Sequence, residues 1–224
     1  MSGIKKVLFI FLFYPFIIIY GQETPVNPVA NKVFTPFVFN PAIAGSKDFL
    51  SVDLIAALQN KQYTQLLGAN TRLRKKGSSG FNDPSMKEFS NIGIGAYAFN
   101  DLTGDYRNTG ISLAGAYHIP LGRKKLSFLS VGAAAKGIFS HYPGDADLGK
   151  PAVDSIFPNL DAGIYFYNPV FHAGISATNI LARPPAADTI PVSRQYFFTA
   201  GFKAVLNRNL NIVLEPNVIT NMGD

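Results

Sequence analysis

A period of two in hydrophobicity runs through most of this sequence, and it restricts the chain to strands. Successive side chains of a β-strand point to opposite faces, so alternation over many residues indicates a strand with one face in an apolar environment. In residues 50–59, one face carries a mainly apolar set, Leu50, Val52, Leu54, Ala56 and Leu58. The opposite face carries a more polar set, Ser51, Asp53, Ile55, Ala57 and Gln59. The pattern predicts an all-β fold.

Turn residues divide the alternating stretches into separate strands. Asn60-Lys61, Asn168-Pro169 and Asn207-Arg208-Asn209 are typical of short turns. Longer loops are expected over residues 75–89, 141–159 and 181–194. The strands predicted between them are 50–59, 62–73, 91–100, 109–119, 126–139, 160–167, 170–177, 196–206 and 210–219.

Composition favours a membrane environment for these strands. Charged residues make up only 15% of the chain, against about a quarter in typical soluble domains. Outside residues 7–20, no apolar run approaches the roughly 20 residues of a membrane-spanning helix. A closed barrel is the other structure that satisfies its backbone in lipid. We therefore expect a transmembrane outer-membrane β-barrel of antiparallel up-and-down strands, with Val131 facing lipid and Lys136 facing the lumen.

Two points bear on that expectation. A soluble two-sheet β-sandwich also has alternating strands, so it remains an alternative. Single-chain bacterial barrels have an even number of strands, whereas nine are predicted here, and residues 215–224 do not form a terminal strand that ends in an aromatic residue. Two explanations stay open: a strand has been missed or divided in this prediction, or the chain is truncated at its C-terminus relative to a complete barrel.

The N-terminus has the order of a secretory signal peptide. Lys5 and Lys6 precede an apolar run from Val7 to Tyr20, and the small residue Gly21 follows. A membrane anchor is the alternative, but the run is shorter than the roughly 20 residues that span a bilayer. Residues 1–21 are thus predicted to be cleaved on export. The chain contains no Cys, which excludes a lipoprotein, a disulfide framework and thiolate metal sites.

One segment immediately before the first predicted strand carries a distinctive motif. Residues 37–46 read FVFNPAIAGS. Pro41 lacks a backbone donor and restricts Asn40 to extended geometry, while Gly45 permits a bend. The motif resembles the hydrophobic-Asn-Pro-Ala-aromatic-Ala-Gly signature near the mature N-terminus of PorP/SprF proteins, with Ile43 where that family usually has Tyr. We divide the mature chain into this N-terminal segment, residues 22–49, and a barrel domain, residues 50–224.

Further motifs of the barrel domain resemble the same family. They are GIGAYAFND at 93–101, RNTGISL at 107–113, YHIPLG at 117–122, FPNLDAGIYFY at 157–167 and YFFTAGF at 196–202. The resemblance implies an outer-membrane component of the type IX secretion system of Bacteroidetes. It also implies a role in gliding and in the export or surface attachment of adhesin-like proteins, with machinery proteins, an exported adhesin-like protein and outer-membrane lipid as partners. A small passive pore or structural barrel is the competing function.

The signature segment has two interpretations. In the functional one it docks a partner or acts as a plug at the end of the barrel. The candidate partner-binding residues are then Phe39, Asn40, Pro41, Ala42, Ala44 and Gly45. The structural interpretation is a cap that starts the sheet in register, because turn residues mostly do that.

Other chemistry finds little support in the sequence. His118, His141 and His172 lack metal-like spacing and are expected in the lumen or in loops. No nucleophile elbow occurs, and no Ser/His/acid set can be assembled, so neither an enzyme, a cofactor nor a small-molecule substrate is expected. The basic clusters, Arg72 to Lys76 and Arg123 to Lys125, are interpreted as solvated turn charges rather than as a nucleic-acid surface.

Overall fold

The computed structural model describes residues 35–59, 62–74, 89–122, 126–144, 152–182, 194–207 and 212–223. The predicted signal peptide, residues 1–21, lies outside these ranges. Two short 3-10 turns come first, η2 (Pro36–Val38) and η3 (Pro41–Ile43). The strands that follow are β1 (Ser51–Gln59), β2 (Gln62–Arg74), β3 (Phe89–Thr103), β4 (Tyr106–Gly122), β5 (Ser127–Tyr142), β6 (Val153–Tyr167), β7 (Phe171–Thr178), β8 (Gln195–Phe202), β9 (Ala204–Asn207), β10 (Ile212–Leu214) and β11 (Asn217–Gly223).

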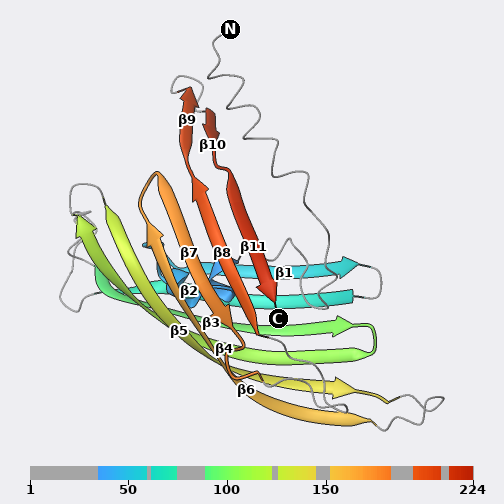
Figure 1. Ribbon diagram of the computed structural model, residues 1–224. Helices are drawn as coiled ribbons and strands as arrows, with labels where there is room; N and C mark the ends of the chain where they lie inside the picture. The colour runs from blue at the N-terminus through green and yellow to red at the C-terminus, as the bar shows by residue number, and fades with distance from the viewer. Residues whose placement is uncertain are drawn as a thin grey trace.

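One curled sheet dominates the molecule. Its nine strands lie in the order β1-β2-β3-β4-β5-β6-β7-β8-β11, and every neighbouring pair is antiparallel. Figure 1 shows the sheet curving into a half-barrel rather than splitting into two packed sheets. The all-β, up-and-down prediction is confirmed. In the described part of the chain, no helix is long and apolar enough to cross a membrane.

The sheet has two edges, β1 and β11. Because the strands alternate in direction across the sheet, these two edge strands run the same way and cannot pair antiparallel with each other. The remaining strands, β9 and β10, form a separate two-stranded sheet. They lie beyond the ends of β8 and β11 (Figure 1).

Several predicted strand limits were wrong. Residues 153–159 were assigned to a loop, but they belong to β6 and pair with β5, with Pro158 opposite Gly137. The predicted strand 196–206 divides at Lys203 into β8 and β9, and the predicted strand 210–219 divides at Glu215 and Pro216 into β10 and β11. The loop predicted over 181–194 falls largely outside the described residues.

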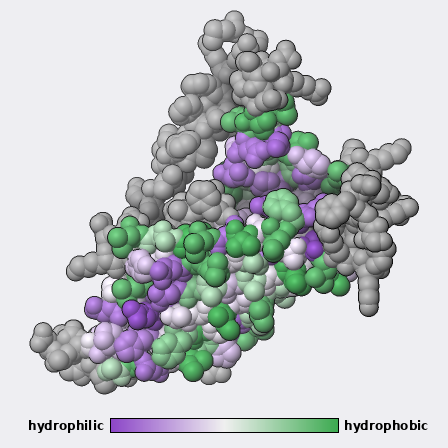
Figure 2. Space-filling model, turned by 180° about the vertical axis from the view of Figure 1, so that it is seen from behind, coloured by the Kyte–Doolittle hydropathy of each residue, from purple (hydrophilic) through white to green (hydrophobic). Residues whose placement is uncertain are grey.

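The alternation predicted from sequence is visible as alternating burial. On β1, Leu54 and Leu58 are 79% and 81% exposed on the outer face of the sheet, and Leu113 on β4 is 66% exposed. Hydrophobic side chains cover much of the described surface seen in Figure 2. Such an outer face suits a hydrocarbon environment and is costly in water.

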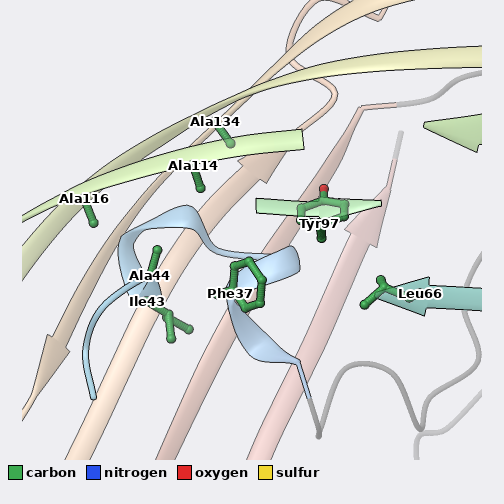
Figure 3. Close-up of a cluster of buried hydrophobic side chains, with 8 residues drawn as sticks. All are labelled: Phe37, Ile43, Ala44, Leu66, Tyr97, Ala114, Ala116 and Ala134. Carbon is green, nitrogen blue, oxygen red and sulfur yellow. The ribbon is translucent and has the colours of Figure 1, made fainter. Parts of the chain in front are cut away.

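The concave face is filled by the start of the described chain. The turns η2 and η3, blue in Figure 1, lie within the curve of the sheet. Side chains from these turns and from four strands form the buried core in Figure 3: Phe37, Ile43, Ala44, Leu66, Tyr97, Ala114, Ala116 and Ala134. Alanines of β4 and β5 leave the space that this segment occupies.

Candidate functional site: a buried segment on the concave face

Residues 35–46, hereafter the inner segment, are the most deeply buried part of the described chain. Thr35, Asn40, Ala42 and Ala44 are fully buried. Residues 47–50, which lead from the segment into β1, are exposed. The segment therefore reaches the edge strand from inside the curve of the sheet.

The local sequence dictates the shape of the inner segment. Each 3-10 turn begins at a proline, Pro36 or Pro41, whose fixed φ suits a first helical position. Asn40 is extended, with φ −136°, as expected before a proline. Its Oδ1 accepts a hydrogen bond from the backbone N of Ala42 at 3.0 Å, so it caps the second turn. Gly45, with φ +73°, then turns the chain towards β1.

The other end of the Asn40 side chain binds the sheet. Its Nδ2 donates to the backbone oxygen of Ile164 on β6 at 3.2 Å and to that of Ile175 on β7 at 3.4 Å. The Asn40 side chain can come this close to the backbone of β6 and β7 only because both strands have a glycine there. A Cβ at Gly163 would lie 2.1 Å from Asn40 Oδ1, and one at Gly174 would lie 2.8 Å from Asn40 Nδ2. Asn40 thus ties the inner segment to two adjacent strands through backbone that only glycine exposes.

Glycines of two further strands form the floor beneath the second turn. A Cβ at Gly93 on β3 would lie 2.0 Å from the oxygen of Ala44, and one at Gly132 on β5 would lie 2.4 Å from the nitrogen of Ala42. By contrast, Gly115 and Gly137 are exposed on the outer face, where a Cβ would meet nothing within 4 Å. Glycine on the concave face is thus a packing requirement of the inner segment.

A chain of hydrogen bonds holds the C-terminal end of the segment. The oxygen of Ala44 lies 2.9 Å from Nε2 of His118, which is fully buried on β4. A carbonyl oxygen only accepts, so Nε2 carries the proton and donates. The Tyr167 hydroxyl then donates to His118 Nδ1 at 3.0 Å and accepts from Nη2 of Arg72. Arg72 is in turn paired with Asp48 at 3.2 Å, just after the segment.

Aromatic contacts and two polar side chains complete the attachment. Phe37 packs edge-on against Tyr97 with ring centroids 5.9 Å apart, and Phe39 packs against Phe197 at 5.1 Å. Ser176 Oγ donates to the backbone oxygen of Phe39 at 2.6 Å. The backbone N of Gly45 donates to Asn70 Oδ1 at 3.2 Å. The sheet therefore recognises both the side chains and the backbone of the inner segment.

A second polar cluster lies on the concave face. Lys136 Nζ is 2.8 Å from Asp161 Oδ2, and it donates to Asn179 Oδ1 at 3.3 Å. Asp161 Oδ1 accepts from the backbone N of Asn179 at 2.8 Å. Lys136 thus faces the concave side, as predicted. It is neutralised there by an ion pair.

The six predicted partner-binding residues lie together, since all belong to the inner segment. Phe39 is half-buried, and the other five, Asn40, Pro41, Ala42, Ala44 and Gly45, are buried by the chain's own sheet. Binding of a partner at these residues stays a prediction, and it requires the segment to move.

The residues that hold the segment were not foreseen from the sequence. Arg72 was interpreted as a solvated turn charge, which is wrong, because it lies in β2 with 7% exposure and stacks over Phe128 at 4.9 Å. The buried position of His118 agrees with the predicted lumenal histidine, but its contact with Ala44 was not predicted. The available signal was the alternation around each residue, which places Arg72 on the same face as Asn70.

The site has no features of a metal centre among the residues that the structure describes. No group of three or more His, Asp or Glu side chains gathers there. Asp145 and Asp147, a closely spaced acidic pair in the sequence, lie outside the described ranges.

Comparison with known proteins identifies the family. No curated protein gives a match to this sequence. The family model described as type IX secretion system membrane protein PorP/SprF matches residues 28–224, which include the inner segment and every strand of the sheet. This chain therefore belongs to the PorP/SprF family of type IX secretion system membrane proteins.

Proposed function

We propose that this protein is an outer-membrane barrel component of the type IX secretion system that supports the export or surface attachment of adhesin-like proteins, and thereby gliding. The observation that carries the proposal is the family match over residues 28–224. The apolar outer face of the sheet, with Leu54 and Leu113 largely exposed, supports contact with outer-membrane lipid. Cleavage of residues 1–21 on export belongs to the same proposal.

The mechanism proposed is binding rather than bond-making. The inner segment is the candidate surface for machinery proteins or for the exported adhesin-like protein, with Phe39 to Gly45 as its contacts. The barrel domain, residues 50–224, acts in this proposal as the wall that stores and presents the segment. No small-molecule substrate or nucleic acid has a role in it.

Localisation is tested by fractionating cells that express the full chain and comparing heated and unheated samples of the outer-membrane fraction on a detergent gel. A heat-dependent mobility shift in that fraction supports a folded outer-membrane barrel. Recovery of the protein without detergent from the periplasm contradicts the proposal.

Export is tested by deleting the gene and measuring secreted and surface-attached proteins together with colony spreading. Selective loss of surface adhesins, restored by the wild-type gene, supports the role. Replacing Asn40-Pro41 by Ala-Ala then tests the inner segment, since export should weaken if the segment docks a partner. Unchanged export with normal assembly contradicts docking.

A passive pore is the competing function, and the filled concave face argues against it. Phe37, Ile43 and Tyr97 pack within the curve of the sheet, so solute flux through it would require the inner segment to leave. Liposome swelling distinguishes the two functions. Rapid entry of small sugars into liposomes that contain the purified protein favours a pore, whereas tight liposomes favour a binding role.

A further inference from the structure

The inner segment is attached in a way that differs from the strands of the barrel wall. Its residues form two 3-10 turns and no strand. The hydrogen bonds that join its backbone to the wall use side chains, from Asn70, His118 and Ser176. Strands such as β5 and β6 instead share a continuous ladder of backbone pairs. The segment can therefore leave without breaking any strand pairing of the described sheet.

The polar contacts of the second turn are concentrated at its two ends. Asn40 binds β6 and β7 at the start of the turn, and Ala44 binds His118 at its end. Between them, Pro41 and Ala42 rest directly on the backbone of β5 at Gly132. A glycine floor offers close packing without interlocking side chains at this point, so the turn is held by the burial of Ile43 and by the contacts at its two ends.

His118 links Ala44, through Tyr167, to the charged pair of Arg72 and Asp48. Its Nε2 donates to Ala44, so its Nδ1 must accept, and the Tyr167 hydroxyl supplies the proton. Tyr167 is held by Arg72, which also binds Asp48 where the segment leaves the concave face. Each group in the chain therefore donates to the next: Arg72 donates to Tyr167, Tyr167 donates to His118, and His118 donates to Ala44.

We propose that residues 35–46 are a plug that leaves and re-enters the concave face as a unit, and that the chain Arg72–Tyr167–His118 is the latch for its C-terminal end. The latch residues are positioning residues, since they act through Ala44 and Asp48. Loss of one hydrogen bond in the chain weakens the others, because each bond polarises and orients the next. This inference deepens the proposed function, in which the segment must move to bind a partner, but its test measures opening of the segment and not export, so the two can fail separately.

The absence of native Cys makes the plug directly measurable. The reporter is Ala44→Cys in the full-length protein, because Ala44 is fully buried and its latch contact is made by the backbone oxygen. Ser46→Cys, nearly isosteric, is a second reporter at the end of the plug. The measurement is the rate of labelling by a membrane-impermeant maleimide in isolated outer membranes. That rate follows the population of the open form when closing is fast.

The decisive pair of variants is Tyr167→Phe and Tyr165→Phe. Tyr167→Phe removes the hydroxyl of the latch and keeps the ring stacked on Phe128. Tyr165→Phe removes a hydroxyl from the same strand, outside the Arg72–His118 chain, and so serves as the matched control. Labelling of the Ala44→Cys reporter should rise about fivefold or more with Tyr167→Phe, the effect of one lost hydrogen bond, and less than about twofold with Tyr165→Phe.

A second pair separates latching from simple packing and serves if Tyr167→Phe does not assemble. His118→Gln retains an N–H that can donate to Ala44, whereas His118→Ala removes it. We expect slow labelling in the first and fast labelling in the second. Equal rates in Tyr167→Phe and Tyr165→Phe, or in the two His118 variants, would overturn the latch. Labelling of Ala44→Cys as fast as that of Asp105→Cys in the exposed turn, with the latch intact, would overturn the plug.

Discussion

Lys136 and Asp161 form an ion pair on the concave face, with Nζ 2.8 Å from Oδ2 and only 8% and 1% of the two side chains exposed. They lie on adjacent strands, β5 and β6, where Lys136 is opposite Asn159 and Ala134 is opposite Asp161. A buried charge is tolerated because its partner and additional hydrogen bonds replace water. Here Asn179 supplies them from the end of the next strand.

Replacing one member of this ion pair should destabilise the barrel more than replacing both members. Lys136→Met leaves the Asp161 carboxylate buried and unpaired, and should lower the free energy of unfolding by about 3 kcal/mol. Lys136→Met with Asp161→Asn should recover most of that loss, since Asn keeps an oxygen for the Asn179 N–H. Urea unfolding in detergent micelles, followed by circular dichroism, measures both. If the Lys136→Met variant were as stable as the wild type, water would have to solvate the Asp161 carboxylate.

Glycine on the concave face should be irreplaceable where the plug rests. Gly132→Ala would place a Cβ 2.4 Å from the backbone N of Ala42. Neither backbone can yield locally, so the plug must shift, at a cost of about 1–3 kcal/mol. Gly137→Ala on the same strand meets nothing within 4 Å and should change stability by less than about 0.5 kcal/mol. The temperature of the gel mobility shift compares them, and equal effects would contradict the packing argument.

Asn40 should not tolerate replacement by Asp. Aspartate caps helices as well as asparagine does, so the hydrogen bond with Ala42 would survive. The second carboxylate oxygen, however, would face the carbonyl oxygens of Ile164 and Ile175 in place of a donor. We expect Asn40→Asp to be destabilised by about 2 kcal/mol or more, and by more than Asn40→Ala. Urea unfolding of the two variants compares their stabilities. If Asn40→Ala were the less stable of the two, the hydrogen bond to Ala42 would matter more than the contacts with Ile164 and Ile175.

The outer face should reject charge. Leu113 lies near the middle of β4 and is 66% exposed. If it contacts lipid, Leu113→Arg should cost about 2–4 kcal/mol and reduce the amount of folded protein in the outer membrane. Asp105→Arg, in the exposed turn between β3 and β4, provides the control and should assemble normally. Equal assembly of the two variants would place Leu113 in water.

Much of the wall could be predicted because the period of a strand is directly visible in its sequence. The faces assigned to Leu54, Val131 and Lys136 are those observed. The limits of β6 were missed because Pro158 and Asn159 are typical turn residues. Pairing with β5 overrides that local preference, with Pro158 opposite Gly137. Local signals therefore indicated the strands, and tertiary pairing set their ends.

The all-β class, the two faces of the strands and the turn at Asn40-Pro41 follow from the sequence alone, because they depend on residues that are neighbours along the chain. The position of this turn inside the sheet, the space that Gly132 and Gly163 leave for it, and the hold of Arg72, Tyr167 and His118 on it emerge only in the folded molecule. Those contacts join residues from different strands. Their alignment depends on the curvature and register of the whole sheet, which no local pattern encodes.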